Sequence, residues 1–191
     1  RVPSPAAKII ALPGVRTWRE LRGEPCIEFE DGFEAKQSIC VSRSFAHEIS
    51  DEDELCEQIA NFASSMAEKL RQQNTLACEM NVFAYTNRFK EDAPQTYSST
   101  LVHFENPVND QRTIVSSAVA AMREVFKKGY GYKKAGVVAT HIISADDVVP
   151  SLFEDTASSE REQKITAAVD RLNVAFGKGT VKLATQGSGR I

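Results

Sequence analysis

Residues 76–104 read LACEMNVFAYTNRFKEDAPQTYSSTLVHF. Two segments rich in β-branched and aromatic residues, 76–89 and 97–104, flank a short polar loop, which is typical of two strands that follow one another in a sheet. Successive side chains of a strand point to opposite faces. In the first strand this alternation assigns Met80, Val82 and Ala84 to one face and Asn81, Phe83, Tyr85 and Asn87 to the other, although Phe83 also suits a packed core.

An amphipathic helix is predicted on each side of this pair of strands. Residues 50–73 carry apolar side chains at spacings of three and four, and Ser50 is a suitable N-cap with acids behind it. The second helix is expected to begin at Asn109 or Asp110 and to stop at Gly129. The apolar positions of this second helix also fall on one face. The apolar positions of the first helix are Leu55, Ile59, Phe62, Met66 and Leu70.

Two further strands, 37–45 and 134–143, complete the order β-α-β-β-α-β. This order predicts an α+β fold of split βαβ type, a four-stranded antiparallel sheet with both helices on one face. The other face would then be free to meet a partner. The prediction divides the chain into a connector with a short helix near Thr17 (1–35), the sheet domain (36–147) and a tail (148–191) with a helix over 159–176 and a short strand at 181–184.

Composition favours a globular protein of the cytoplasm. Of 191 residues, 42% are hydrophobic and 26% are charged, and the net charge is −3. No apolar run approaches the roughly 20 residues that span a bilayer, so no membrane association is expected. The opening RVPSPAAK lacks a leader pattern and suggests a piece of a longer protein. The four cysteines form no CxxC pair and are expected to be buried, reduced thiols.

No catalytic or metal-binding motif is present in the sequence. The three histidines lie in separate elements without HxxxH or HExxH spacing, and no phosphate-binding glycine loop follows a strand. The acidic run 51–54 is interpreted as a helix start, where carboxylates complement the helix dipole. We therefore predict no catalytic residue, no metal site and no cofactor in this chain.

Four segments resemble the C-terminal part of UmuC-like, Y-family translesion DNA polymerases. QSICVSRSF (37–45) resembles the strand that opens the family's little-finger domain, and YKKAGV (132–137) resembles its last strand. Residues 16–23 are similar to the end of the thumb and tether, and residues 172–187 to the extreme C-terminus. The resemblance implies an error-prone polymerase whose catalytic core, with its carboxylates and Mg²⁺, precedes this region.

The resemblance also implies that this region holds primer-template DNA. Short polar side chains and cations contact phosphates without reading sequence. The expected contacts on DNA are Ser42, Arg43, Ser44, Asn81, Tyr85, Asn87, Arg88 and Lys133. At the position of Tyr85 the family often has a basic residue, which predicts a weaker grip there.

A second expected site is a peptide for the sliding clamp. In VPSLF (149–153), Leu152 and Phe153 would be the pocket anchors, supported by Val149, Pro150 and Ser151, and Val149 stands where the family has Gln. Packing of Leu152 and Phe153 onto the domain itself is the alternative. The family further implies UmuD-like and RecA partners. The rival interpretation is a ferredoxin-like regulatory or oligomerisation domain that binds a small ligand.

Overall fold

The computed structural model describes residues 12–26, 37–90, 92–148 and 156–187. It divides into two compact units, Arg1–Ala35 and Lys36–Ile191. In the first unit, helix α2 (Leu12–Glu20) begins earlier than the short helix expected near Thr17. The Arg22 guanidinium lies 4.1 Å from the centre of the Trp18 ring and so covers one face of the indole.

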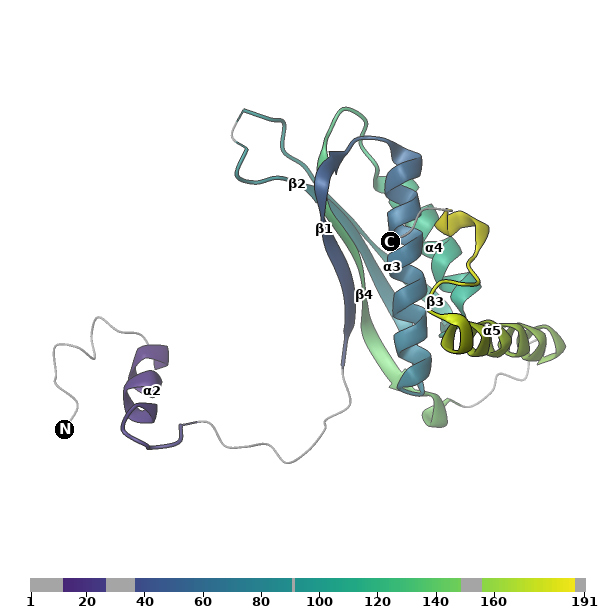
Figure 1. The fold of residues 1–191 in the computed structure, drawn as a ribbon, viewed down its shortest axis with the longest axis horizontal. Coiled ribbons are helices and arrows are strands. Elements are labelled where there is room, and N and C mark those ends of the chain that lie inside the picture. Colours follow the sequence, from purple (N-terminus) through teal and green to yellow (C-terminus); the bar gives the residue numbers. More distant parts are fainter. Residues whose placement is uncertain (1–11, 27–36, 91, 149–155, 188–191) are drawn as a thin grey trace. The chain divides into compact units, whose positions relative to one another are not determined.

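The second unit has the predicted α+β fold. Its four strands form one antiparallel sheet in the order β1-β4-β2-β3. Helices α3 and α4 lie together on one face of this sheet (Figure 1). The elements are β1 (Ile39–Ile49), α3 (Glu52–Gln72), β2 (Thr75–Thr86), β3 (Tyr97–Val108), α4 (Gln111–Val125), β4 (Tyr132–Ser144), the 3-10 turn η1 (Ala145–Asp147), α5 (Thr156–Phe176) and the 3-10 turn η2 (Ala184–Gln186).

The core lies between the sheet and the two helices. The predicted inward set of β2, Met80, Val82 and Ala84, is fully buried. It packs against the apolar faces of α3 and α4, where burial of each large side chain contributes roughly 1.5–3 kcal/mol. All five apolar positions predicted for the first helix are buried: Leu55, Ile59, Phe62, Met66 and Leu70.

Some predicted element ends are wrong. The N-cap of α3 is Asp51 and not Ser50, since the Asp51 carboxylate accepts a hydrogen bond from the Glu54 amide at 2.9 Å. Asp110 caps α4 in the same way, at 2.7 Å from the Thr113 amide. Helix α4 ends at Val125, before Gly129. β1 and β3 run on past the predicted strands, and β2 ends at Thr86.

The C-terminal segment packs back on α3, on the side of the sheet that carries the helices (Figure 1). The expected strand at 181–184 is not formed; an irregular stretch leads into η2 instead. The Gln186 side chain is 5% exposed and sits between α3 and α4. Its amide oxygen accepts from Gln111 Nε2 at 3.2 Å, and its amide nitrogen donates to Asn61 Oδ1 at 3.3 Å.

Candidate nucleic-acid interface

The face of the sheet opposite the helices, called the open face below, is built from cross-strand rows. Residues directly opposite each other in neighbouring strands share a face. Each row crosses the strands in the order β1, β4, β2 and β3. The middle row is Ser42, Gly136, Phe83 and Ser99. The row on one side of it is Ser44, Lys134, Tyr85 and Tyr97, and the row on its other side is Cys40, Val138, Asn81 and Leu101.

The structure thus brings four of the predicted contact residues onto one surface. Ser42 and Ser44 of β1 lie in the same rows as the outward side chains of β2, and Asn81 and Tyr85 are half-buried there. The Asn81 side-chain oxygen Oδ1 accepts a hydrogen bond from the Ser99 hydroxyl at 2.8 Å, which fixes the orientation of the side-chain amide.

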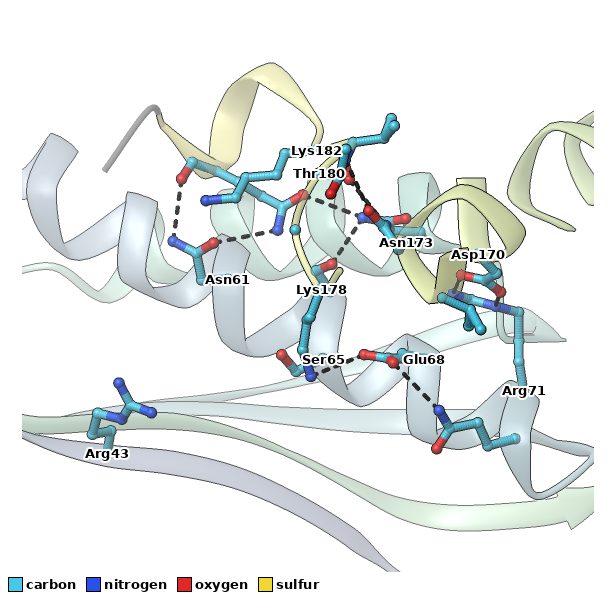
Figure 2. A pocket seen from close by; sticks show the side chains of 17 residues that line it. Arg43, Asn61, Ser65, Glu68, Arg71, Asp170, Asn173, Lys178, Thr180 and Lys182 are labelled. Atoms are coloured by element: carbon cyan, nitrogen blue, oxygen red, sulfur yellow. Dashed lines mark hydrogen bonds and ion pairs between the residues drawn. The ribbon is translucent and has the colours of Figure 1, made fainter. Parts of the chain in front are cut away.

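Arg43 does not share this surface. It pairs with Ala135, whose side chain is buried on the helix side of the sheet. Because neighbouring residues of a strand point to opposite faces, Arg43 leaves the sheet on the helix side while the two serines beside it face the other way. In Figure 2 its side chain stands on β1 below α3.

Gly136 allows the open face to pack closely. A β-carbon at this position would lie 2.8 Å from the Val41 carbonyl oxygen and 2.9 Å from the Phe83 ring. The ring therefore lies across the bare backbone of β4. Phe83 is half-buried on the open face, so its ring belongs to this surface and not to the core between the sheet and the helices.

An aromatic row continues from Phe83 across the sheet. The Phe83 and Tyr85 ring centres are 6.2 Å apart with an angle of 14° between the planes, and Tyr85 and Tyr97 are 6.1 Å apart at 24°. The Arg88 guanidinium lies 5.4 Å from the centre of the Tyr85 ring. This end of the open face therefore combines nearly parallel rings with cationic side chains.

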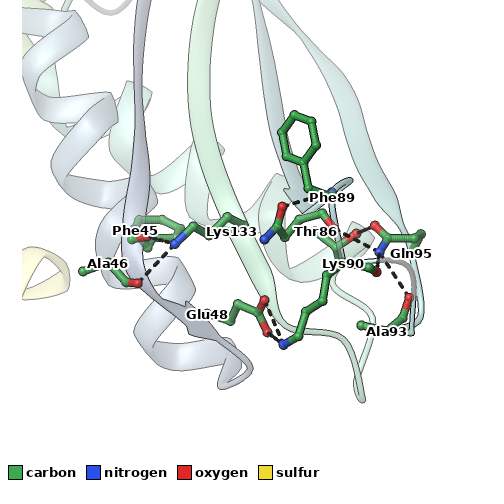
Figure 3. Close-up of polar contacts among 10 residues, drawn as sticks. Phe45, Ala46, Glu48, Thr86, Phe89, Lys90, Ala93, Gln95 and Lys133 are labelled. Atoms are coloured by element: carbon green, nitrogen blue, oxygen red, sulfur yellow. Dashed lines mark hydrogen bonds and ion pairs between the residues drawn. The ribbon is translucent and has the colours of Figure 1, made fainter.

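The loop between β2 and β3 is organised by Gln95 (Figure 3). Its amide nitrogen donates to the carbonyl oxygens of Asn87, Lys90 and Ala93 at 3.0, 2.8 and 3.1 Å. The Thr86 hydroxyl donates to Gln95 Oε1 at 2.6 Å. One amide side chain thus holds together the loop that carries Arg88.

Asn87, one of the predicted DNA contacts, takes part in the turn of this loop. The Asn87 side-chain oxygen accepts from the Phe89 amide at 3.2 Å, so it is engaged in the turn. Phe89 is 96% exposed at this turn. An ion pair of 3.1 Å between Lys90 and Glu48 joins the loop to β1.

Lys133 stabilises an irregular part of β1. Its ammonium group donates to the Phe45 and Ala46 carbonyl oxygens at 2.6 and 3.1 Å (Figure 3). These carbonyls lie where the register between β1 and β4 shifts, so Lys133 satisfies acceptors that the ladder leaves without a partner. Two of its three donors are used.

Lys134, and not Lys133, belongs to the open face. Lys134 was not among the DNA contacts expected from the sequence. Alternation counted back from Gly136 would have identified it.

A polar cleft of about 1020 Å³ lies on the helix side, between α3 and the C-terminal segment (Figure 2). Arg71 holds Asp170 through two hydrogen bonds of 2.7 and 2.8 Å, and Lys178 pairs with Glu68 at 3.0 Å. Arg43 stands at its border. These ion pairs connect α3 with the C-terminal segment across the cleft, within the second unit.

Two acids at the start of α3 are engaged within the protein. Asp51 is the helix cap, and Asp53 pairs with Arg123 at 3.2 Å. Among the described residues no group of three His, Cys, Asp or Glu side chains is placed to hold a metal ion. Burial raises the pKa of the Cys56 thiol, which opposes formation of a nucleophilic thiolate.

No helix in the described ranges has both the length and the apolar character needed to cross a membrane.

The predicted clamp peptide, 149–153, lies outside the described residues.

Comparison with known sequences gives a consistent set of relatives. Residues 36–152 match the family model described as impB/mucB/samB family C-terminal domain. Protein UmuC of Salmonella typhimurium is 36% identical over 172 residues, covering 90% of this chain and 41% of the relative. Protein ImpB of the same species is 34% identical over 91% of this chain and 41% of its own length. The chain therefore spans about two fifths of these relatives.

Solved structures give weaker likenesses. A complex of a beta-clamp processivity factor with the little finger domain of PolIV aligns with a TM-score of 0.43 and 15% identity, over 61% of this chain and 99% of that one. An insertion ternary complex of Dbh DNA polymerase aligns with a TM-score of 0.47 and 14% identity, over 74% of this chain and 38% of that one.

Proposed function

Since this chain belongs to the impB/mucB/samB family, we propose that it is the DNA-holding C-terminal region of an error-prone translesion DNA polymerase. It would act in the cytoplasm during repair of damaged DNA. The observation that supports this most directly is the open face, where Ser42, Ser44, Asn81, Tyr85 and Lys134 lie together on a regular sheet.

The open face suits contacts to a DNA backbone. Serine hydroxyls and an asparagine amide donate to phosphate oxygens, and lysine and arginine neutralise them. Arg88 extends the cationic edge from the β2–β3 loop, and Lys133 keeps one donor for a phosphate. Such contacts position DNA without reading sequence, which a bypass enzyme requires. A net charge of −3 is compatible with this role because charges can be sorted by face.

Polymerase chemistry is assigned to another part of the full-length protein. Nucleotidyl transfer needs carboxylates that hold two metal ions about 3.5–4 Å apart. The carboxylates at the start of α3 do not fit that need, because Asp51 caps a helix and Asp53 pairs with Arg123. We propose that Mg²⁺ and its ligands belong to a catalytic core outside this chain.

Two kinds of partner complete the proposal. Val149–Phe153 would dock on the sliding clamp, with Leu152 and Phe153 as anchors, which is supported by the apolar Leu-Phe ending beside Glu154 and Asp155. UmuD-like and RecA partners follow from the family, and we assign no residue to them.

The first prediction is that this chain binds duplex primer-template DNA weakly and without sequence preference. Because phosphate contacts dominate, the dissociation constant should lie near 10⁻⁴–10⁻⁶ M and rise steeply with salt. Fluorescence anisotropy with two unrelated duplexes over a series of salt concentrations measures both properties. Absence of binding at low salt, or affinity that does not depend on salt, would show the proposal to be wrong.

A further inference from the structure

We propose that the aromatic row Phe83, Tyr85 and Tyr97 binds the bases of single-stranded DNA by stacking. The inference rests on the proposed DNA-holding function and adds to it a class of substrate. It assigns to the open face a task that backbone contacts to a duplex do not require, since a duplex keeps the faces of its bases stacked inside.

The three rings lie on one face of the sheet. Phe83 and Tyr85 are two residues apart on β2, an inner strand of the sheet, and therefore share a face. Tyr97 of β3 stands opposite Tyr85 and continues the row. The planes differ by 14° and 24° along the row, so a further planar group can add to it with a similar orientation.

All three rings are at least partly exposed. Tyr97 is 57% exposed and stands on β3, at the edge of the sheet. Phe83 and Tyr85 are half-buried on the same face. Packing of the hydrophobic core explains none of these three rings, because the core lies on the other side of the sheet. A base has two flat faces and can cover an exposed ring whatever its identity, with about 1–3 kcal/mol per stacked base.

Cationic side chains lie beside the aromatic row. Lys134 stands beside Tyr85 in the same row, and the Arg88 guanidinium lies 5.4 Å from the Tyr85 ring centre. Glu79 lies on the far side of Asn81 from this end and pairs with His103 at 3.3 Å. The aromatic end is thus cationic, which suits a strand that has planar bases joined by phosphates.

Four-stranded sheets backed by two helices use the same device elsewhere. RNA recognition motifs stack two or three bases on aromatic side chains of the open sheet face. This chain differs in strand order, but it has the same physical elements: alternating aromatic residues on an inner strand, a neighbouring ring and flanking cations. In a bypass polymerase the ligand would be unpaired DNA.

The test compares three DNA probes: an oligothymidylate of about 15 nucleotides, an abasic oligonucleotide of the same length, and a duplex of that length. Tyr97→Leu removes the ring and keeps an apolar side chain; Tyr97→Phe keeps the ring; Leu101→Ala is a matched control on the same strand and face. Because Tyr97 and Leu101 are both exposed on the edge strand β3, thermal melting should show all three variants folded.

We expect Tyr97→Leu to weaken oligothymidylate binding about 5-fold or more and to leave duplex and abasic binding within about 2-fold, with Tyr97→Phe and Leu101→Ala close to the parent. If the parent binds oligothymidylate no better than the abasic probe, or if Tyr97→Leu changes neither, the stacking site is overturned while duplex binding still supports the proposed function. If no probe binds at low salt, both proposals fail.

Discussion

At the scale of single residues, two adjacent lysines have separate tasks. Lys133 donates to two carbonyl oxygens of β1 and supports the strand, whereas Lys134 lies beside Tyr85 on the open face. The neighbours Ser42 and Arg43 are divided in the same way between two faces. Adjacent residues can therefore belong to different surfaces, and the position of each residue in the pleat decides which surface it joins.

These placements give a second prediction. Lys134→Ala should weaken binding to all DNA sequences alike and lower the salt slope by about one, because one phosphate contact is lost. Arg43→Ala, the matched control on the other face, should have the smaller effect. Salt-dependent anisotropy of both variants decides the matter. A larger loss from Arg43→Ala would mean that DNA follows the helix side of the β1 edge.

Single residues also mark the limit of the sequence analysis. Ser50 and Asp51 are both good caps, so the sequence alone could not choose between them. Lys133 could not be recognised as a structural residue because its acceptors, Phe45 and Ala46, lie in a distant strand at a register shift. In contrast, alternation in residues 80–85 predicted both faces of β2, because the period of a strand depends on local geometry alone.

At the scale of elements, the β2–β3 loop is held by one side chain. Gln95 donates to three loop carbonyls and accepts from Thr86. The two strands that it joins were predicted from their composition. The order of the strands in the sheet was not, since the pairing of β1 with β4 joins distant parts of the chain. Contacts of this kind leave no pattern in a short window of sequence.

The third prediction concerns this loop. The Lys90 and Ala93 amides donate to the Asn87 and Lys90 carbonyl oxygens, which Gln95 also binds. Gln95→Ala should therefore speed amide hydrogen exchange at Lys90 and Ala93. It should reduce global stability by less than about 1.5 kcal/mol, because the lost hydrogen bonds lie at the surface. Gln95→Glu keeps the acceptor for Thr86 and loses the donors, so it should loosen the loop in the same way. Unchanged exchange in both variants would show that Gln95 does not hold the loop.

At the scale of the whole second unit, the C-terminal segment is part of the folded structure. Gln186 joins α3 and α4 through Asn61 and Gln111, and Asp170 of α5 is held by Arg71 of α3. The sequence predicted the helix of this segment but could not show where it packs, because the contacts are polar and depend on the pairing of particular side chains.

The fourth prediction tests this attachment. Gln186→Ala removes the donor to Asn61 Oδ1 and the acceptor for Gln111 Nε2 and the Leu183 amide, and should cost about 1–3 kcal/mol in the free energy of unfolding. Thr185→Ala, at the exposed neighbouring position, is the control and should change little. Urea denaturation of the two variants measures the difference. Equal midpoints would mean that the segment adds no stability.

The sheet order has a consequence for synthesis on the ribosome. β1 is an edge strand whose partner is β4, the last strand of this sheet in sequence order. The hairpin of β2 and β3 can form earlier, since its strands are close in the chain. Until β4 emerges, the Ile39–Ile49 segment has no place in the sheet and its apolar residues remain available to other chains. A nascent chain interrupted before Tyr132 would expose this strand, and premature termination there should yield an aggregating product that depends on chaperones.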